Sequence, residues 1–416
     1  MESIIINILI ASVLISVSSS LVGTFALLQR KSLVGDAIAH ATLPGVCLSF
    51  LLAGEKNPFI LILGALVTGW LSLLFIDFVQ SKTKIKKDAI LGITLSIFFA
   101  LGIMLLTYMQ HMPHLGNISG LSDYIFGNIV SVNRTDLLAF SAISLLCLIG
   151  IIALYKELVI YSFDESFAHA IGLKTNLIRF ILSFLTILTI ISNMQAIGMI
   201  LTASMLITPA AAARFWTNKL STIFALAIAF SILSSLFGVF ISYHYTIPTG
   251  PLIVVFVSTI AILSFLFAPK KGIFSKRWNL MLLKRKVADE NMLKLMFKLG
   301  EKEGNITKKR TTAELSLSIG KKKTLASLAR LKHRSYVNKV NDVWQLTKEG
   351  VEKGKRITRL HRLWELYLTT HLQIAPDHVH EDAETIEHII TPELEKELEK
   401  VLGYPKVDPH EKEIPY

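Results

Sequence analysis

Long apolar runs, separated by short polar segments, fill the chain up to about residue 268. A membrane-spanning helix needs about 20 predominantly apolar residues. The first run is too long for a signal-peptide core and lacks a cationic start, so we interpret it as a span. The pattern predicts an all-α polytopic membrane domain over residues 1–270. We expect its nine spans near residues 4–28, 33–53, 58–80, 89–109, 135–155, 177–193, 196–214, 220–242 and 249–268.

After residue 269 the pattern becomes that of a small water-soluble fold. An amphipathic helix is predicted over 289–299, a second helix begins at Thr311-Thr312, where either residue is a suitable cap, and a third covers 321–331. Two short strands, 336–337 and 343–346, flank Asn341-Asp342, which is a hairpin signal. These elements describe a winged helix-turn-helix at 285–350, after a juxtamembrane linker at 271–284. Residues 351–416 are predicted to form a helical domain.

Composition and loop charge support this division and orient the spans. The hydrophobic fraction is 52% and the mean hydropathy is +0.53, which is too apolar for an ordinary soluble protein. Cytoplasmic loops carry an excess of Lys and Arg, and the loops after spans one, three, five, seven and nine are the richer ones. We therefore expect an N-terminus outside the cell and a cytoplasmic C-terminal domain.

The positive charge is concentrated in one block. The net charge is +3 over residues 1–268, +15 over 269–340 and −6 over 341–416, which together give the +12 of the whole chain. Such a block is attracted either to anionic lipid or to nucleic acid. The predicted order of three helices followed by a hairpin favours DNA-binding ancestry. In that fold Lys321, Lys322 and Lys323 begin the recognition helix, where phosphates are contacted, and Arg330 follows on it.

Two ionisable residues interrupt the second apolar run. Asp36 and His40 are four residues apart and therefore share one face of a helix. A charged side chain inside a bilayer is costly and marks a functional site by default. Carboxylate and imidazole together offer oxygen and nitrogen ligands to a divalent transition metal.

Histidines and carboxylates recur at helical spacing in the acidic C-terminal region. His361 and Glu365 are four residues apart, and a second group combines imidazoles with carboxylates at i, i+4, i+7 and i+8. One interpretation is a cytoplasmic metal site; the other is a solvated Glu-rich helix with incidental histidines. The second group consists of His380, Glu384, Glu387 and His388.

Several chemistries are not indicated. The phosphate-binding signature Gly-x-x-x-x-Gly-Lys-Ser/Thr does not occur, so the sequence predicts no ATP hydrolysis by this chain. Cys47 and Cys147 both fall in apolar spans, where packing is a better explanation than chemistry or a zinc cluster. We therefore expect a non-enzymatic protein.

The membrane half resembles the manganese/zinc/iron ABC transporter permease family. The resemblance implies a permease in the bacterial plasma membrane that pairs with a second permease subunit, identical or paralogous. It would receive metal from an extracytoplasmic binding protein and be driven by a cytoplasmic ATPase subunit. It places Asp36 and His40 on the metal pathway and assigns ATPase coupling to Phe163, Asp164, Glu165, Ala168 and Gly172. The matching segments are Lys31–Gly45, Phe163–Leu173, Gln195–Ala211 and Ile247–Pro251.

The region from about residue 285 resembles the diphtheria toxin repressor family of metal-dependent regulators. The match includes His361–Glu365, Val379–His388 and Gly403-Tyr-Pro405. The resemblance implies one metal site with His361, Glu365 and His380, and another with Glu384, Glu387 and His388. Asn291 and Lys294 stand where the first helix of that family contributes further ligands, so the sequence departs from the pattern there.

These observations predict the permease subunit of an ABC importer for manganese, iron or zinc, with a metal-regulator-like domain in the cytoplasm. The metal is expected as substrate and as a regulatory ligand of that domain. The alternative is a membrane-tethered or proteolytically released metal-dependent repressor that binds DNA. The ligand types do not choose among the three metals.

Overall fold

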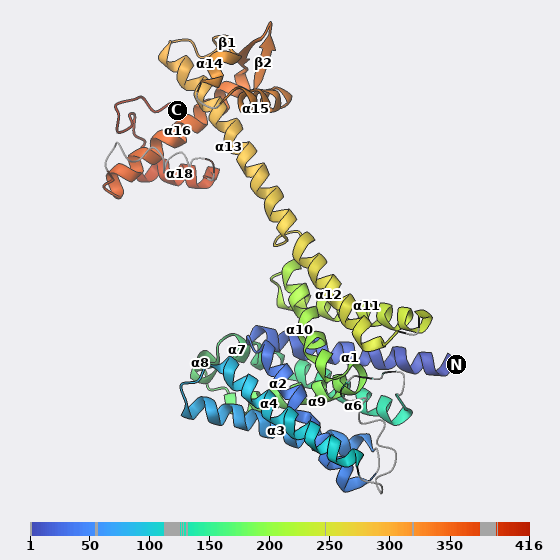
Figure 1. The fold of residues 1–416 in the computed structure, drawn as a ribbon. Helices are drawn as coiled ribbons and strands as arrows, with labels where there is room; N and C mark the ends of the chain where they lie inside the picture. The colour runs from blue at the N-terminus through green and yellow to red at the C-terminus, as the bar shows by residue number, and fades with distance from the viewer. Residues whose placement is uncertain are drawn as a thin grey trace. The chain divides into compact units, whose positions relative to one another are not determined.

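The computed structural model describes residues 2–54, 57–111, 125, 127, 129, 132–245, 247–317, 320–374, 388 and 390–416. The chain divides into two compact units, residues 1–276 and 277–416. Figure 1 follows it from the N-terminus in blue to the C-terminus in red. Each unit is described by itself below.

The first unit is a bundle of long apolar helices. Within the described part of the chain, nine helices are long and apolar enough to cross a membrane, which confirms the nine predicted spans. Two short helices, α7 (Tyr155–Phe163) and α8 (Glu165–Ala170), lie between the fifth and sixth spans. The nine long helices are α1 (Glu2–Leu28), α2 (Ser32–Ala53), α3 (Pro58–Lys82), α4 (Lys87–Gln110), α6 (Arg134–Ala153), α9 (Thr175–Ile197), α10 (Met199–Trp216), α11 (Leu220–Tyr245) and α12 (Thr249–Phe267).

Two of the spans contain a proline that does not end the helix. Helix α2 continues through Pro44 and α10 continues through Pro209. Packed neighbours make such prolines tolerable in membrane helices, because they satisfy the freed backbone groups. The chain breaks instead at Gly198, between α9 and α10, where φ is +95°. Only glycine adopts that region readily.

Helix α2 packs deeply inside the bundle. Its residues Ile38, Leu43 and Phe50 belong to an apolar core shared with α3, α4 and α9. A Cβ atom on Gly45 would lie 2.1 Å from the backbone oxygen of Gly64 on α3, and one on Gly64 would lie 2.3 Å from the oxygen of Gly45. The two backbones therefore touch directly, as small residues permit between membrane helices.

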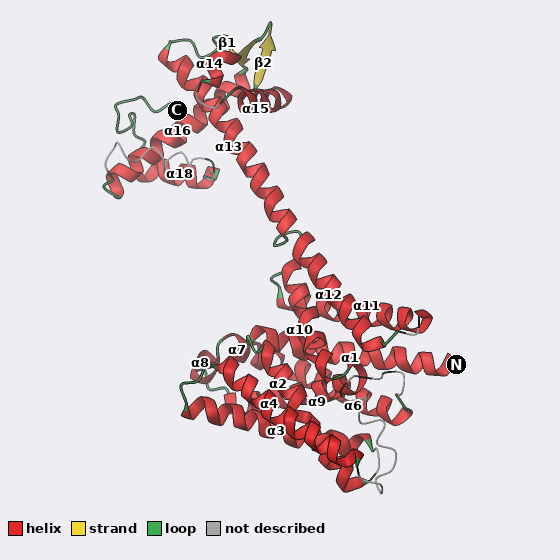
Figure 2. Ribbon diagram, in the orientation of Figure 1, coloured by secondary structure: helices red, strands yellow, loops and turns green. Residues whose placement is uncertain are grey.

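The second unit is a small helical domain with a three-stranded sheet, which contains the predicted hairpin and one further strand. Figure 2 shows the strands in yellow among red helices. Helix α13 begins in the first unit, so most of the expected linker at 271–284 is helical. The elements are α13 (Ile273–Lys302), β1 (Arg310–Thr311), α14 (Thr312–Ser316), α15 (Lys321–His333), β2 (Val337–Val340), β3 (Val343–Leu346), α16 (Lys348–His371) and α18 (Pro392–Val401).

The sheet has the strand order β1-β3-β2, and both pairs are antiparallel. Asn341 and Asp342 join β2 to β3 with positive φ angles of 47° and 64°. This combination is typical of the two-residue hairpin turn that favours Asn and Asp. Thr311 caps α14 in a reciprocal arrangement with Glu314, which identifies it as the capping residue. Strand β1 was not predicted.

The core of the second unit joins α13 to the sheet and to α15. Met292, Leu293 and Met296 of α13 pack with Leu328 of α15 and Trp344 of β3. A buried carboxylate reinforces this packing, because Arg330 donates from Nε and Nη2 to Asp289 at 2.7–3.1 Å. A smaller cluster, made by Leu363, Leu398 and Ile414, joins α16 to α18 and the chain end.

Candidate metal pathway and metal centre

Asp36 and His40 lie one turn apart on α2, as their spacing predicts. Nε2 of His40 is 3.7 Å from Oδ1 of Asp36, and the two side chains are 13% and 37% exposed respectively. The imidazole ring packs edge-on against Phe99 of α4, with 4.9 Å between ring centroids. Its Nδ1 atom is buried and has no hydrogen-bond partner among the described residues. The pair is therefore held loosely and presents two metal-binding atom types on one helix face.

A cavity of about 920 Å³ lies on the opposite face of α2 from this pair. From the first two turns of α2 it is lined by Val34, Gly35 and Ile38, which are offset by about half a turn from Asp36 and His40. Burial, and then the nearby positive charges of Lys87 and Arg179, lower the pKa of Lys31 at its rim. The structure therefore does not combine the cavity and the pair in one site. The polar lining includes Gln29, Lys31, Asp77, Gln80, Lys87, Tyr161, Glu165, Asn176 and Arg179.

The segment matched to the coupling region forms the short helix α8. Asp164 caps it by accepting a hydrogen bond from the Phe167 N–H at 2.9 Å. Glu165 forms an ion pair with Arg179 at the start of α9, and Arg179 Nε also donates to the Tyr161 hydroxyl at 3.2 Å. Gly172 ends the segment with φ at +84°. The polar residues of this segment thus shape α8 and tie it to α9.

The apolar residues of this segment divide into buried and exposed sets. Ala168 is fully buried against the bundle, whereas Phe163, Phe167 and Ile171 are 68%, 55% and 49% exposed. These three recur at every fourth position but come from successive segments, since Phe163 ends α7, Phe167 lies on α8 and Ile171 follows α8. Phe167 and Ile171 were missed as candidate site residues, although the repeat of large apolar residues every fourth position is visible in the sequence.

A second His–carboxylate pair lies on α16 and is built differently. Nε2 of His361 is 2.8 Å from Oε1 of Glu365, and both side chains are almost fully buried, at 4% and 2% exposed. Arg362 lies beside them, pairing with Glu301 of α13 at 2.5 Å. The predicted ligand atoms are present here, but they already bind one another.

His388 has protein partners at both ring nitrogens. Nδ1 is 2.7 Å from Oε2 of Glu290, and Nε2 is 3.0 Å from Oδ1 of Asn291. Burial would raise the pKa of Glu290, but the hydrogen bond from His388 and the charges of Lys353 and Lys286 outweigh it and lower that pKa. Lys294 is buried at 5% exposure. As arranged, both ring nitrogens of His388 have protein partners, and Asn291 and Lys294 stand where the repressor resemblance implies further metal ligands.

The remaining predicted ligands, His380, Glu384 and Glu387, lie outside the described residues. Among the residues that the structure does describe, no three His, Cys, Asp or Glu side chains converge as a metal site would require. The two-site arrangement implied by the repressor resemblance therefore stays a prediction.

The predicted DNA-contacting residues fall into two groups. Lys321, Lys322 and Lys323 form the first turn of α15 and are all exposed. Arg330 instead uses its guanidinium to hold Asp289, and it also donates to Ser327 at 3.0 Å. Its side chain is thus a packing element between α15 and α13, which leaves the three lysines as candidate phosphate contacts.

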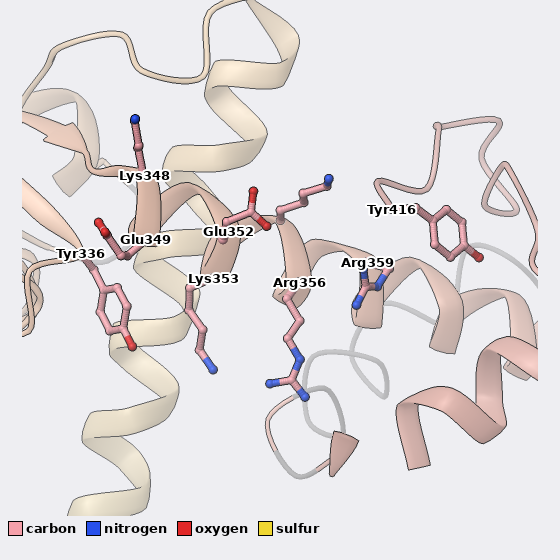
Figure 3. A pocket seen from close by; sticks show the side chains of 9 residues that line it. Tyr336, Lys348, Glu349, Glu352, Lys353, Arg356, Arg359 and Tyr416 are labelled. Atoms are coloured by element: carbon pink, nitrogen blue, oxygen red, sulfur yellow. The ribbon is translucent and has the colours of Figure 1, made fainter. Parts of the chain in front are cut away.

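A surface hollow of about 600 Å³ follows α16, with Tyr336 at one end and Tyr416 at the other (Figure 3). Three of its five cationic side chains are paired within the unit, and the other two, Lys348 and Lys355, share the lining with Glu349 and Glu352. Arg356 and Arg359 both contact Glu395, and Lys353 Nζ lies 3.4 Å from Glu290. The hollow therefore carries little uncompensated positive charge for an anionic ligand.

Comparison with known proteins agrees with this two-part construction. The family described as "ABC 3 transport family" matches residues 1–268, and "Iron dependent repressor, metal binding and dimerisation domain" matches residues 347–416. The chain is 34% identical over 373 residues to "Manganese transport system membrane protein MntC" of Bacillus subtilis, with 88% of this chain and 85% of the relative covered. It is 36% identical over 274 residues to "Zinc transport system membrane protein TroC" of Treponema pallidum, with 66% and 92% covered.

Among solved structures, the membrane half is similar to "PsaBC from Streptococcus pneumoniae in complex with Fab". The sequence identity is 36%, the TM-score is 0.58, and the match covers 64% of this chain and 92% of the other. As a multi-pass membrane subunit of this kind, the chain is not itself the catalytic component of a transporter. The chain therefore belongs to the ABC 3 transport family of metal transporter permeases, with an iron-dependent repressor metal-binding and dimerisation domain fused at its C-terminal end.

Proposed function

We propose that this chain is the permease subunit of an ABC importer for a divalent transition metal, with manganese and zinc as the first candidates and iron as the third. The observation that carries this proposal is the Asp36–His40 pair, an oxygen and a nitrogen ligand 3.7 Å apart within an apolar span. The similarity to proteins named for manganese and zinc transport supports the metal class.

The loose geometry of the pair suits transit rather than storage. Transition metals in proteins bind four or more ligands, so two side chains hold a cation weakly. Asp36 is 37% exposed in a single chain, which leaves room for further ligands from water or from a second permease subunit. A weak, incomplete site accepts a cation and also releases it.

Import requires partners that this chain does not contain. A cytoplasmic ATPase subunit would dock on α8 and the residues beside it, where Phe163, Phe167 and Ile171 are exposed. An extracytoplasmic metal-binding protein would deliver the cation from the other side. Loop charges favour an N-terminus outside and the second unit in the cytoplasm, so the cavity lined by Lys31, Asp77 and Arg179 would open toward the cytoplasm.

Metal-resolved uptake tests the proposal. The full chain would be expressed with its ATPase and binding-protein partners in a bacterial strain that lacks its own importers, and uptake of radioactive manganese, zinc and iron would be compared. We expect saturable uptake of at least one metal that requires an intact ATPase. Absence of uptake of all three metals, with the protein present in the membrane, would disprove the import function.

A second candidate function is specific DNA binding by the second unit, as a tethered or released repressor. Its support is the exposed Lys321–Lys323 turn at the start of α15, followed by the β2–β3 hairpin. Gel-shift measurements with the full chain in lipid nanodiscs, with and without added manganese or zinc, test it. Failure to bind DNA under either condition at physiological salt would exclude this function.

A further inference from the structure

Residues 277–285, in the first half of α13, make no side-chain hydrogen bond, ion pair or ring contact with the rest of the described structure. Every residue from 277 to 286 is exposed, although the second half of the same helix packs in the core of the second unit through Met292, Leu293 and Met296. The exposed residues include large apolar ones at 44–61% exposure, namely Trp278, Leu280, Met281, Leu282 and Leu283. A helix that only bridges two domains through water is polar on all sides, so this composition requires a covering surface.

Charge brackets this apolar stretch at both ends. Arg277 precedes it, and Lys284 and Arg285 follow it. Trp278, Met281 and Leu282 are spaced i, i+3 and i+4 and form one stripe, which Arg285 continues. Tryptophan and long cationic side chains are the residues that favour the boundary between lipid tails and headgroups, and clustered cations are attracted to anionic lipid.

The chain itself keeps this segment close to a bilayer. The last span, α12, ends at Phe267, and α13 begins at Ile273. The turn between them is held within the first unit, where Phe267 stacks on Phe274 with 5.1 Å between centroids and Lys271 donates to the backbone oxygen of Arg214 at 2.9 Å. Residues 277–286 therefore begin within a few residues of the membrane surface.

From this composition and position we propose that residues 277–286 form an interfacial helix that binds the anionic lipid surface of the leaflet where α12 ends. The apolar residues enter the boundary between headgroups and tails, and Arg277, Lys284 and Arg285 contact lipid phosphates. Lys286 is not part of this contact set, because it donates to the backbone oxygen of His388 at 3.1 Å. The proposal depends on the membrane spans but not on the transported metal.

Site-directed spin labelling of the full chain in nanodiscs tests the proposal. Met281→Cys carries one label, and Lys302→Cys, exposed in the last turn of the same helix, carries the control label. The unsubstituted chain measures background labelling at Cys47 and Cys147, which are both buried. In phosphatidylglycerol-containing discs, we expect the ratio of oxygen to water-soluble nickel accessibility to be several-fold higher at 281 than at 302.

The same experiment tests whether anionic lipid is required, and whether solvent or a second copy of the chain surrounds the segment instead. Replacing Arg277, Lys284 and Arg285 together by glutamine, or using discs of phosphatidylcholine alone, should lower the ratio at position 281 toward that of the control. Equal accessibilities at 281 and 302 in anionic discs would show a solvated helix and overturn the proposal. Strong spin–spin broadening between labels at 281 would also overturn it, because a second copy of the chain would then cover the segment.

Discussion

The two units each contain a histidine and a carboxylate four residues apart on one helix, yet the two pairs differ in geometry and burial. On α2, Asp36 and His40 stand 3.7 Å apart and are partly exposed. On α16, His361 and Glu365 are in hydrogen-bond contact at 2.8 Å and almost fully buried. The same residue types thus make an open pair in the membrane unit and a closed pair in the second unit. Burial and partner atoms, rather than spacing, decide which pair is available to a passing cation.

Substitution of Glu365 should have the largest effect, and it should be an effect on stability. Removing one partner of a buried pair leaves the other uncompensated, so Glu365→Ala should destabilise the second unit by about 3 kcal/mol. Hydrogen exchange of α16 amides in the full chain measures this loss. Glu352→Ala, at an exposed position on the same helix, is the control and should leave exchange unchanged.

Metal uptake by the chain with Glu365→Ala is a second measurement, which tests the contrast between the two pairs. If Glu365→Ala preserved the protection of α16 but abolished uptake, the buried pair would itself serve transport. The contrast between an open and a closed pair would then be wrong.

Substitution of Asp36 should abolish function without affecting folding. Asp36→Asn keeps the shape but removes the charge, and loss of a group that binds or orients a metal costs at least about tenfold. Uptake of the transported metal should therefore fall by at least that factor, and His40→Ala should act similarly. The matched control is Leu52→Ala, since Leu52 is 87% exposed on the same helix. Normal uptake by Asp36→Asn at equal expression would remove the pair from the pathway.

The tie between α8 and α9 should have a moderate effect. Arg179 and Glu165 are 45% and 49% exposed, and exposed ion pairs contribute about 1 kcal/mol or less, so Arg179→Gln should lower uptake by at most about fivefold. Restoration of uptake by the exchanged pair Arg179→Glu with Glu165→Arg would show that the pairing matters, not either residue alone. An uptake rate that Arg179→Gln leaves unchanged would show that α8 is positioned by apolar packing.

The smallest effect on uptake is expected at the basic turn of α15. Replacing Lys321, Lys322 and Lys323 together by alanine should leave uptake unchanged, because they lie outside the membrane unit. If the second unit binds DNA, the same change should reduce the slope of log affinity against log salt by about 3, since each lysine releases about one counterion. A slope unaffected by the triple substitution would place the phosphate contacts elsewhere.

Much of the fold was predictable because membrane spans and amphipathic helices leave clear patterns. All nine spans were found from apolar length alone, and the hairpin from Asn341-Asp342. Strand β1 was missed because two residues carry no periodicity, and they become a strand only by pairing with β3. The helix over residues 273–286 was missed because its apolar stripe is short, and because Leu280 and Leu283 lie off that stripe and weaken the helical period.

The sequence predicted where the candidate residues lie on their helices, but not which side chains and cavities surround them. The spacing of Asp36 and His40 indicates a shared helix face, but only packing shows that the cavity is on the other side of α2. Arg330 is a residue type that often contacts DNA. Only the structure shows that it instead pairs with Asp289 of α13. His388 contacts Glu290 and Asn291 through its two ring nitrogens. These residues are about a hundred positions apart, so local sequence patterns do not reveal the contacts.

The direct backbone contact between Gly45 and Gly64 constrains how the transporter moves. With no side chains between them, α2 and α3 approach closely, and we expect the two helices to move together as one body during transport. Asp36 and His40 lie on α2 and therefore belong to that body. If the pair lies on the metal pathway, as proposed, access to it would have to change at the surfaces that face it, which include α4 at Phe99. A side chain added at either glycine would push α2 and α3 apart, so we expect it to impair transport although Asp36 and His40 are still present.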